Sequence, residues 1–262
     1  LPEVYSAYNL YVDGALIEQM GNPDPDHYVE RIQHRMFTFK AHTSVEIMIA
    51  VTDKTSASPG LQYVPAFGNP LKINTIRGIP IFINSSVFTL LLLVLSFSVW
   101  TFFGTRSRAN ALFAVVCVCV LGYSCYPLLN TYMALSVQPW FSMEMLFYFL
   151  AFPAMLLLEC ELTGRKNKWG RWAALIAAVA GVGVTIAGAL AGGSDKVIFS
   201  YQISQATEVL KWFTAICLIL AAFFYTEETR GLPLLAGTVF YAVSLAADRI
   251  WPLYDPIIGG WF

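Results

Sequence analysis

One stretch near the start of the chain alternates between apolar and polar positions, a period typical of half-buried β-strands. Along residues 4–12, one face of such a strand would carry apolar side chains, those of Val4, Tyr8, Leu10 and Val12. Asp13-Gly14 follows, and a second apolar run occupies residues 15–20. Asp-Gly between two apolar runs favours a type I′ hairpin turn, because both central residues of that turn need a positive φ. Residues 4–20 are therefore predicted to form a β-hairpin.

A second alternating stretch covers Val45–Val51, and weaker strands are predicted at Met36–Ala41 and Leu71–Arg77. Four or five strands are too few for a β-sandwich, which usually needs seven or more. We therefore interpret residues 1–78 as part of a jelly-roll-like sandwich and expect further strands to precede Leu1.

The pattern changes after residue 80 to long apolar runs. Residues 81–103 carry no charge, and 23 helical residues are long enough to cross a ~30 Å hydrocarbon core at ~1.5 Å per residue. Residues 79–262 are predicted to form a membrane helical bundle with spans at about 81–103, 109–133, 140–160, 172–193, 204–226 and 232–252. Because the chain ends on the aromatic pair Trp261-Phe262 after an even number of spans, we expect a seventh helix beyond it.

Basic residues in alternate loops set the orientation of such a bundle. The first, third and fifth loops together hold seven basic residues: Arg106, Arg108, Arg165, Lys166, Lys168, Arg171 and Arg230. The second loop has no charge, and the fourth has Lys196 against Asp195. The odd loops are therefore predicted to be cytoplasmic and residues 1–78 extracytoplasmic.

Composition agrees with a membrane protein and excludes nucleic-acid binding. The 262 residues are 57% hydrophobic and 13% charged, whereas soluble domains average about 25% charged residues. The net charge of −1 comes without the clustered basic face that binding to phosphates requires.

Small residues are frequent in the fourth predicted helix, at Gly181, Gly183, Gly188 and Gly192. The spacing Gly188-xxx-Gly192 lets helices approach closely. Packing inside the same bundle is favoured over a dimer face.

No catalytic, cofactor or metal motif is present in the sequence. Asn22, Asp24 and Asp26 lack the spacing of a complete calcium loop and are interpreted as a solvated turn. His27, His34 and His42 are interpreted as surface or cross-strand residues. We predict no catalytic residues, no metal ligands and no cofactor.

Charges inside the predicted spans are the main candidates for a functional site. On the predicted orientation they fall in the outer halves of the helices, at a level shared with polar residues of the second helix. We define the outer polar cluster as Glu144, Glu208, Lys211, Asp248, Arg249, Tyr123, Tyr126 and Asn130. Charges in a bilayer normally pair or line a wet cavity. The cluster is therefore either a set of anchors that orients the bundle, or a ligand-binding or coupling site.

Several short motifs together resemble a known family, the bacterial seven-transmembrane receptors with diverse intracellular signalling modules. They are Tyr8–Gly14, the strand 45–51, the run Gly60-Leu61…Pro65…Phe67-Gly68, and Ala247-Asp248-Arg249-Ile250. The resemblance implies an extracytoplasmic jelly-roll, seven helices and a cytoplasmic output module such as a histidine kinase or diguanylate cyclase. It also implies a small-molecule ligand, carbohydrate-like among the candidates, and a homodimer in the membrane.

The leading hypothesis is thus a receptor that senses an extracytoplasmic ligand. A secondary transporter is the alternative, although the chain lacks the internal hydropathy repeat and paired broken helices of many transporters. A membrane-embedded enzyme is a third class, disfavoured because no catalytic signature is present.

Overall fold

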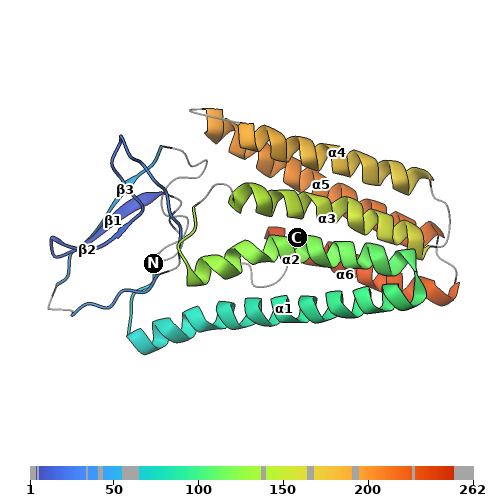
Figure 1. Ribbon diagram of the computed structural model, residues 1–262, viewed down its shortest axis with the longest axis horizontal. Helices are drawn as coiled ribbons and strands as arrows, with labels where there is room; N and C mark the ends of the chain where they lie inside the picture. The colour runs from blue at the N-terminus through green and yellow to red at the C-terminus, as the bar shows by residue number, and fades with distance from the viewer. Residues whose placement is uncertain are drawn as a thin grey trace. The chain divides into compact units, whose positions relative to one another are not determined.

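The computed structural model describes residues 4, 6–33, 35–40, 44–54, 65–136, 140–163, 168–190, 195–225 and 228–250, with side chains except at 80, 127, 141, 188–189, 195–205, 225, 228–231, 245 and 247–250. Within these ranges the chain forms three strands followed by six helices (Figure 1). The strands are β1 (Ala7–Val12), β2 (Ala15–Met20) and β3 (Ile47–Thr52). The helices are α1 (Pro70–Thr105), α2 (Arg108–Tyr132), α3 (Trp140–Leu162), α4 (Lys168–Leu190), α5 (Asp195–Tyr225) and α6 (Glu228–Ile250).

The predicted hairpin is confirmed. β1 and β2 pair antiparallel, and the turn residues Asp13 and Gly14 have φ angles of 50° and 78°, the positive values that a type I′ turn requires. β3 pairs with the other edge of β1, also antiparallel, so the strand order is β2-β1-β3. This is a small antiparallel sheet of three described strands.

One face of the sheet is buried, as the alternation predicts. Val4, Tyr8, Leu10 and Met20 form a buried cluster, against which the partly buried Phe37, Ile47, Ile49 and Ala134 pack. The Tyr8 side chain is 1% exposed, and this burial, together with the nearby Glu18 charge, raises the pKa of Tyr8 to about 12. The phenol therefore stays neutral at any physiological pH.

The weaker predicted strands are wrong within the described residues. Met36–Lys40 is irregular, and Ala41 lies outside the described residues. Leu71–Arg77 is helical because α1 begins at Pro70, eight residues before the boundary expected at 78. Asn69 caps this helix by accepting the Leu71 N–H on its side-chain oxygen at 2.9 Å. An Asn cap followed by Pro at the first helical position is a strong start signal, and it outweighs the short apolar alternation.

Five of the helices are long and apolar enough to cross a membrane: Pro70–Thr105, Arg108–Tyr132, Ser142–Leu162, Lys168–Ala187 and Ala206–Phe224. The chain is a multi-pass membrane protein. The sixth predicted span is helical, but its apolar part within the described residues, Leu232–Ser244, is shorter than the ~20 residues a crossing needs.

Helix α3 is the centre of packing in the bundle. The main buried cluster joins its aromatic face to α4 and α5: Tyr148, Phe149, Phe152, Leu156, Ala174, Ala177, Leu210 and Leu218. Two glycines bring neighbouring backbones close to α3. A Cβ on Gly122 of α2 would lie 2.4 Å from the Phe147 ring, and one on Gly181 of α4 would lie 2.6 Å from the Phe149 Cβ.

The close approach predicted for the fourth helix is therefore present at Gly181, between two helices of one bundle. A Cβ added at Gly183, in contrast, would have no neighbouring atom within 4 Å. Gly192 lies outside the described residues, so the GxxxG part of the prediction stays a prediction.

The chain divides into two compact units. The first unit comprises Leu1–Phe82, Tyr126–Phe141 and Leu190–Tyr201. Within it, Ile32 and Leu135 form an antiparallel bridge with N–H···O distances of 2.8 and 3.1 Å, and the Arg77 guanidinium donates to the Thr131 carbonyl at 3.4 Å. The bridge joins the segment after the hairpin to the α2–α3 connection. The Arg77 bond joins the first part of α1 to the end of α2. The second unit holds the remaining parts of the helices, Ile83–Cys125, Ser142–Ala189 and Gln202–Phe262.

We predict that Gly181→Ala destabilises the bundle by about 1–3 kcal/mol, because the new methyl group overpacks the contact with Phe149. Gly183→Ala is the matched control on the same helix. It should be neutral or stabilising by about 0.5–1 kcal/mol, since alanine removes the entropic cost of a mid-helix glycine. Thermal unfolding in detergent, followed by tryptophan fluorescence, measures both. Equal midpoints for the two variants would contradict the α3–α4 contact.

Candidate functional site

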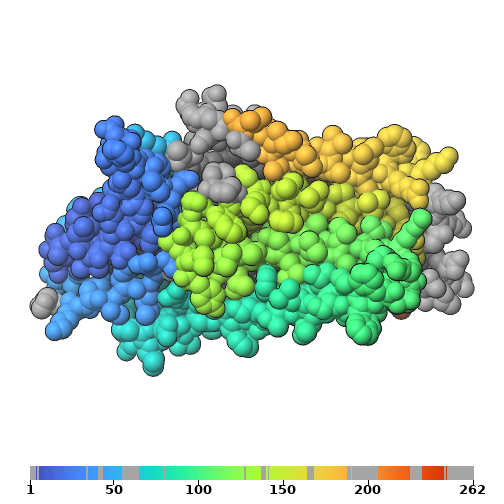
Figure 2. All heavy atoms as spheres, in the orientation of Figure 1, coloured from blue at the N-terminus to red at the C-terminus, as the bar shows by residue number. Residues whose placement is uncertain are grey.

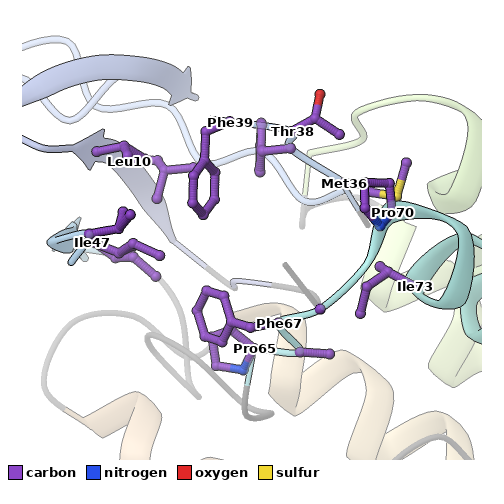
Figure 3. A pocket seen from close by; sticks show the side chains of 15 residues that line it. Leu10, Met36, Thr38, Phe39, Ile47, Pro65, Phe67, Pro70 and Ile73 are labelled. Atoms are coloured by element: carbon purple, nitrogen blue, oxygen red, sulfur yellow. The ribbon is translucent and has the colours of Figure 1, made fainter. Parts of the chain in front are cut away.

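A cavity of about 530 Å³ lies in the first unit, on the buried face of the sheet. Five segments line it: the strand β1, residues 45–49 leading into and along β3, the irregular run Met36–Phe39, the run Pro65–Gly68, and the first turn of α1. Figure 3 shows the side chains around one space, with Leu10 and Ile47 contributed by the sheet and Ile73 by α1.

Local structure explains why these side chains converge. Leu10 and Val12 point to the same face of β1, and the register pairs them with Ile49 and Ile47 of β3. All four therefore face the cavity. The Asn69 cap fixes where α1 begins, and this places Pro70 and Ile73 in the wall.

The side chains of the cavity wall are almost all apolar. Among the described residues that line the cavity, Thr38 alone has a polar side chain and none is charged. Such a wall can hold an apolar body and exclude water from it, but it offers no nucleophile, acid or base. Cavities of ~300–1,000 Å³ are the usual size for small-molecule sites, so the geometry indicates a binding site for a small apolar molecule.

The pattern of the sequence does not predict this cavity. Its lining comes from segments up to about sixty residues apart, and no periodicity indicates which of them meet. The one available signal was Asn69-Pro70, which would have placed Pro70 and Ile73 on a helix adjoining the sheet.

The outer polar cluster is brought together in part. Glu208 and Lys211 lie one turn apart on α5, with Oε1 and Nζ 3.6 Å from each other. The Lys211 side chain is 11% exposed and that of Glu208 is 30% exposed. This is the pairing that the spacing of three residues predicts.

Tyr148 of α3 connects this ion pair to the second helix. The Lys211 ammonium lies 6.0 Å from the centre of the Tyr148 ring, within cation–π range. The Tyr148 ring in turn lies 5.0 Å from that of Tyr123, tilted by 40°. Tyr148 is absent from the predicted cluster, although it follows Glu144 by four residues and so shares its helix face.

The other predicted members are placed on their own helices. Glu144 is half-buried on α3. Tyr126 and Asn130 are 4% and 0% exposed on the last turns of α2 and belong to the first unit. Asp248 and Arg249 lie at the end of α6, and their side chains are outside the described residues.

A buried carboxyl group near the other end of α3 was also missed. Glu159 is 5% exposed, and its Oε1 atom forms no hydrogen bond with any described residue. Its backbone carbonyl accepts the Thr163 hydroxyl at 2.9 Å. Glu159 lies fifteen residues beyond Glu144, or about 22 Å along the helix, so it does not belong to the outer polar cluster.

The Asn22–His27 turn uses its side chains for local bonds. The Asn22 side chain accepts the Asp24 N–H, and the Asp24 side chain accepts the Asp26 N–H, both at 3.1 Å. The Asp26 bond and the neighbouring His27 lower the pKa of Asp24. No group of three potential metal ligands occurs among the described residues. His34 and His42 lie outside them.

No protein-family model, curated protein or solved structure matches this chain. Its class therefore follows from its own fold and composition: a multi-pass helical membrane protein with a small antiparallel sheet at its N-terminal end.

We predict that Lys211→Met destabilises the bundle more than the double variant Glu208→Gln/Lys211→Met. The single change removes the ammonium that Glu208 contacts, and a partly buried carboxylate without its cation costs more than a neutral pair. A double-mutant cycle on thermal midpoints measures the coupling, with the exposed Lys168→Met as the control for loss of a lysine. Additive effects would reduce Glu208 and Lys211 to independent interfacial anchors.

Proposed function

We propose that this chain is the sensing and membrane part of a bacterial receptor, which binds a ligand at its extracytoplasmic side and signals across the membrane. The observation that carries the proposal is that the cavity wall includes the first turn of α1, a helix that continues through the membrane. A ligand in this cavity touches the membrane-spanning element directly.

For signalling, the ligand must bind one arrangement of the protein more tightly than the other. Pro70 and Ile73 can supply that difference, because their distance from the sheet sets the width of the cavity. A shift of the first turn of α1 would reach Thr105 because the helix is continuous over 36 residues.

The packing of α1 favours such a movement. In its most apolar window no residue is buried within the structure, and exposed side chains such as Phe97 and Trp100 run along the helix. Figure 2 shows the atoms of α1 on the visible surface along its length. Lipid, which is fluid, would be the main neighbour of this helix, whereas α3 is held by the buried aromatic cluster.

The remaining parts of the proposal follow from charge and resemblance. The seven basic residues of the odd loops support an extracytoplasmic sheet, which belongs to a jelly-roll in the proposed family, the bacterial seven-transmembrane receptors with diverse intracellular signalling modules. The output is then a histidine kinase or cyclase module after a seventh helix, in a homodimer. The ion pair Glu208–Lys211 is a coupling element in the bundle.

The test loosens α1 between the cavity and the membrane-spanning part of the helix, and it changes no residue of the cavity wall. Thr75 and Ile76 are exposed on α1, between the lining residue Ile73 and Arg77. Replacing both by glycine loosens the helix, since each glycine costs about 1 kcal/mol relative to alanine. The Thr75→Ala/Ile76→Ala variant is the matched control, because it removes the same side chains and keeps the helix stiff.

The full-length protein is expressed in a host strain that lacks its own copy, with the amount in the membrane matched. Transcript profiles measure the output. The glycine variant should give the profile of the strain without the protein, and the alanine variant that of wild type. Identical profiles for the glycine and alanine variants would contradict the coupling through α1.

A further inference from the structure

We infer that the cavity of the first unit takes a small amphiphile with a hydrocarbon body, such as a medium-chain fatty acid, from the aqueous phase. The inference rests on the proposed receptor function and names the ligand class of that site. It replaces the carbohydrate-like ligand that the family resemblance implies.

The composition of the wall discriminates between these ligand classes. A saccharide carries a hydroxyl group on most of its carbons, and each hydroxyl that loses water needs a new hydrogen-bond partner. The described lining side chains supply one hydroxyl, that of Thr38, and otherwise aliphatic, aromatic and proline groups. A hydrocarbon chain needs no partner and gains from leaving water.

Two aromatic side chains give the ligand its strongest contacts. Phe39 and Phe67 line the cavity and are 38% and 66% exposed, which is high for side chains of this size. Figure 3 shows both around the cavity, with Phe67 beside Pro65. A hydrocarbon body between them would cover apolar surface that is now in contact with water.

The position of the cavity along α1 favours a water-borne ligand over a membrane lipid. Arg77 is the last charge before the uncharged residues 78–105, so the hydrocarbon layer begins beyond it. Pro70 precedes Arg77 by seven residues, or about 10 Å along the helix, while a headgroup layer is only about 5–8 Å thick. The acyl chain of a lipid would have to leave its own layer to enter the cavity.

The experiment measures binding of the fluorescent fatty acid 11-(dansylamino)undecanoic acid to the whole chain in lipid nanodiscs. Ala66→Trp places an indole in the cavity, because Ala66 is an exposed lining residue. Ala50→Trp is the matched control, since Ala50 is exposed on β3 and does not line the cavity. Partition of the probe into lipid is the same background in all discs.

We expect saturable binding to wild type and to Ala50→Trp with equal dissociation constants, and roughly tenfold or greater weakening in Ala66→Trp, the change that ~1.4 kcal/mol produces. Phe67→Ala, which removes a wall without adding bulk, should weaken binding as well. Dodecanoate should displace the probe and maltose should not.

Binding no greater than in empty discs, equal affinity in the two tryptophan variants, or displacement by maltose would each overturn the inference. The outcome is separable from that of the proposed function. If the probe does not bind and the Thr75→Gly/Ile76→Gly variant still loses its output, only the ligand class is rejected. If the probe binds saturably and the Thr75→Gly/Ile76→Gly variant keeps the wild-type output, only the receptor mechanism is rejected.

Discussion

The continuity of α1 is the constraint on which the account depends. In lipid every backbone N–H and C=O group must be paired within the chain, so the uncharged residues 78–105 have to be helical. The Asn69 cap starts this same helix at Pro70, well before the apolar stretch. The residues that the membrane forces into a helix and the residues that close the cavity therefore belong to one element. Without that extension the cavity would end at a loop.

Different forces stabilise the sheet and the helical bundle. The sheet is stabilised by removal of apolar side chains from water, with Tyr8 and Leu10 at the centre. Inside a bilayer that driving force is absent, and close packing takes its place. This explains why glycines 122 and 181 meet aromatic residues of α3, and why Lys211 lies beside both a carboxylate and the Tyr148 ring.

Much of the fold could be predicted because its signals are local. Asp13-Gly14 determines the hairpin, and the period of two determines which face of β1 is buried; the apolar runs determine the helices. Leu71–Arg77 is helical and not the predicted strand, because the Asn69-Pro70 start signal outweighs its short alternation. The site was less predictable. The Glu208–Lys211 pair follows from a spacing on one helix, whereas Tyr148 and the cavity depend on contacts between distant segments. No periodicity encodes such contacts.

The most direct test determines on which side of the membrane the sheet lies. In a background without the five native cysteines, Asn22→Cys reports on the turn after β2 and Asn167→Cys on the connection between α3 and α4. A membrane-impermeant maleimide applied to intact cells should label the first and spare the second, because the basic residues of the odd loops hold them in the cytoplasm. Labelling of Asn167→Cys with protection of Asn22→Cys would place the cavity in the cytoplasm and contradict a receptor for extracytoplasmic ligands.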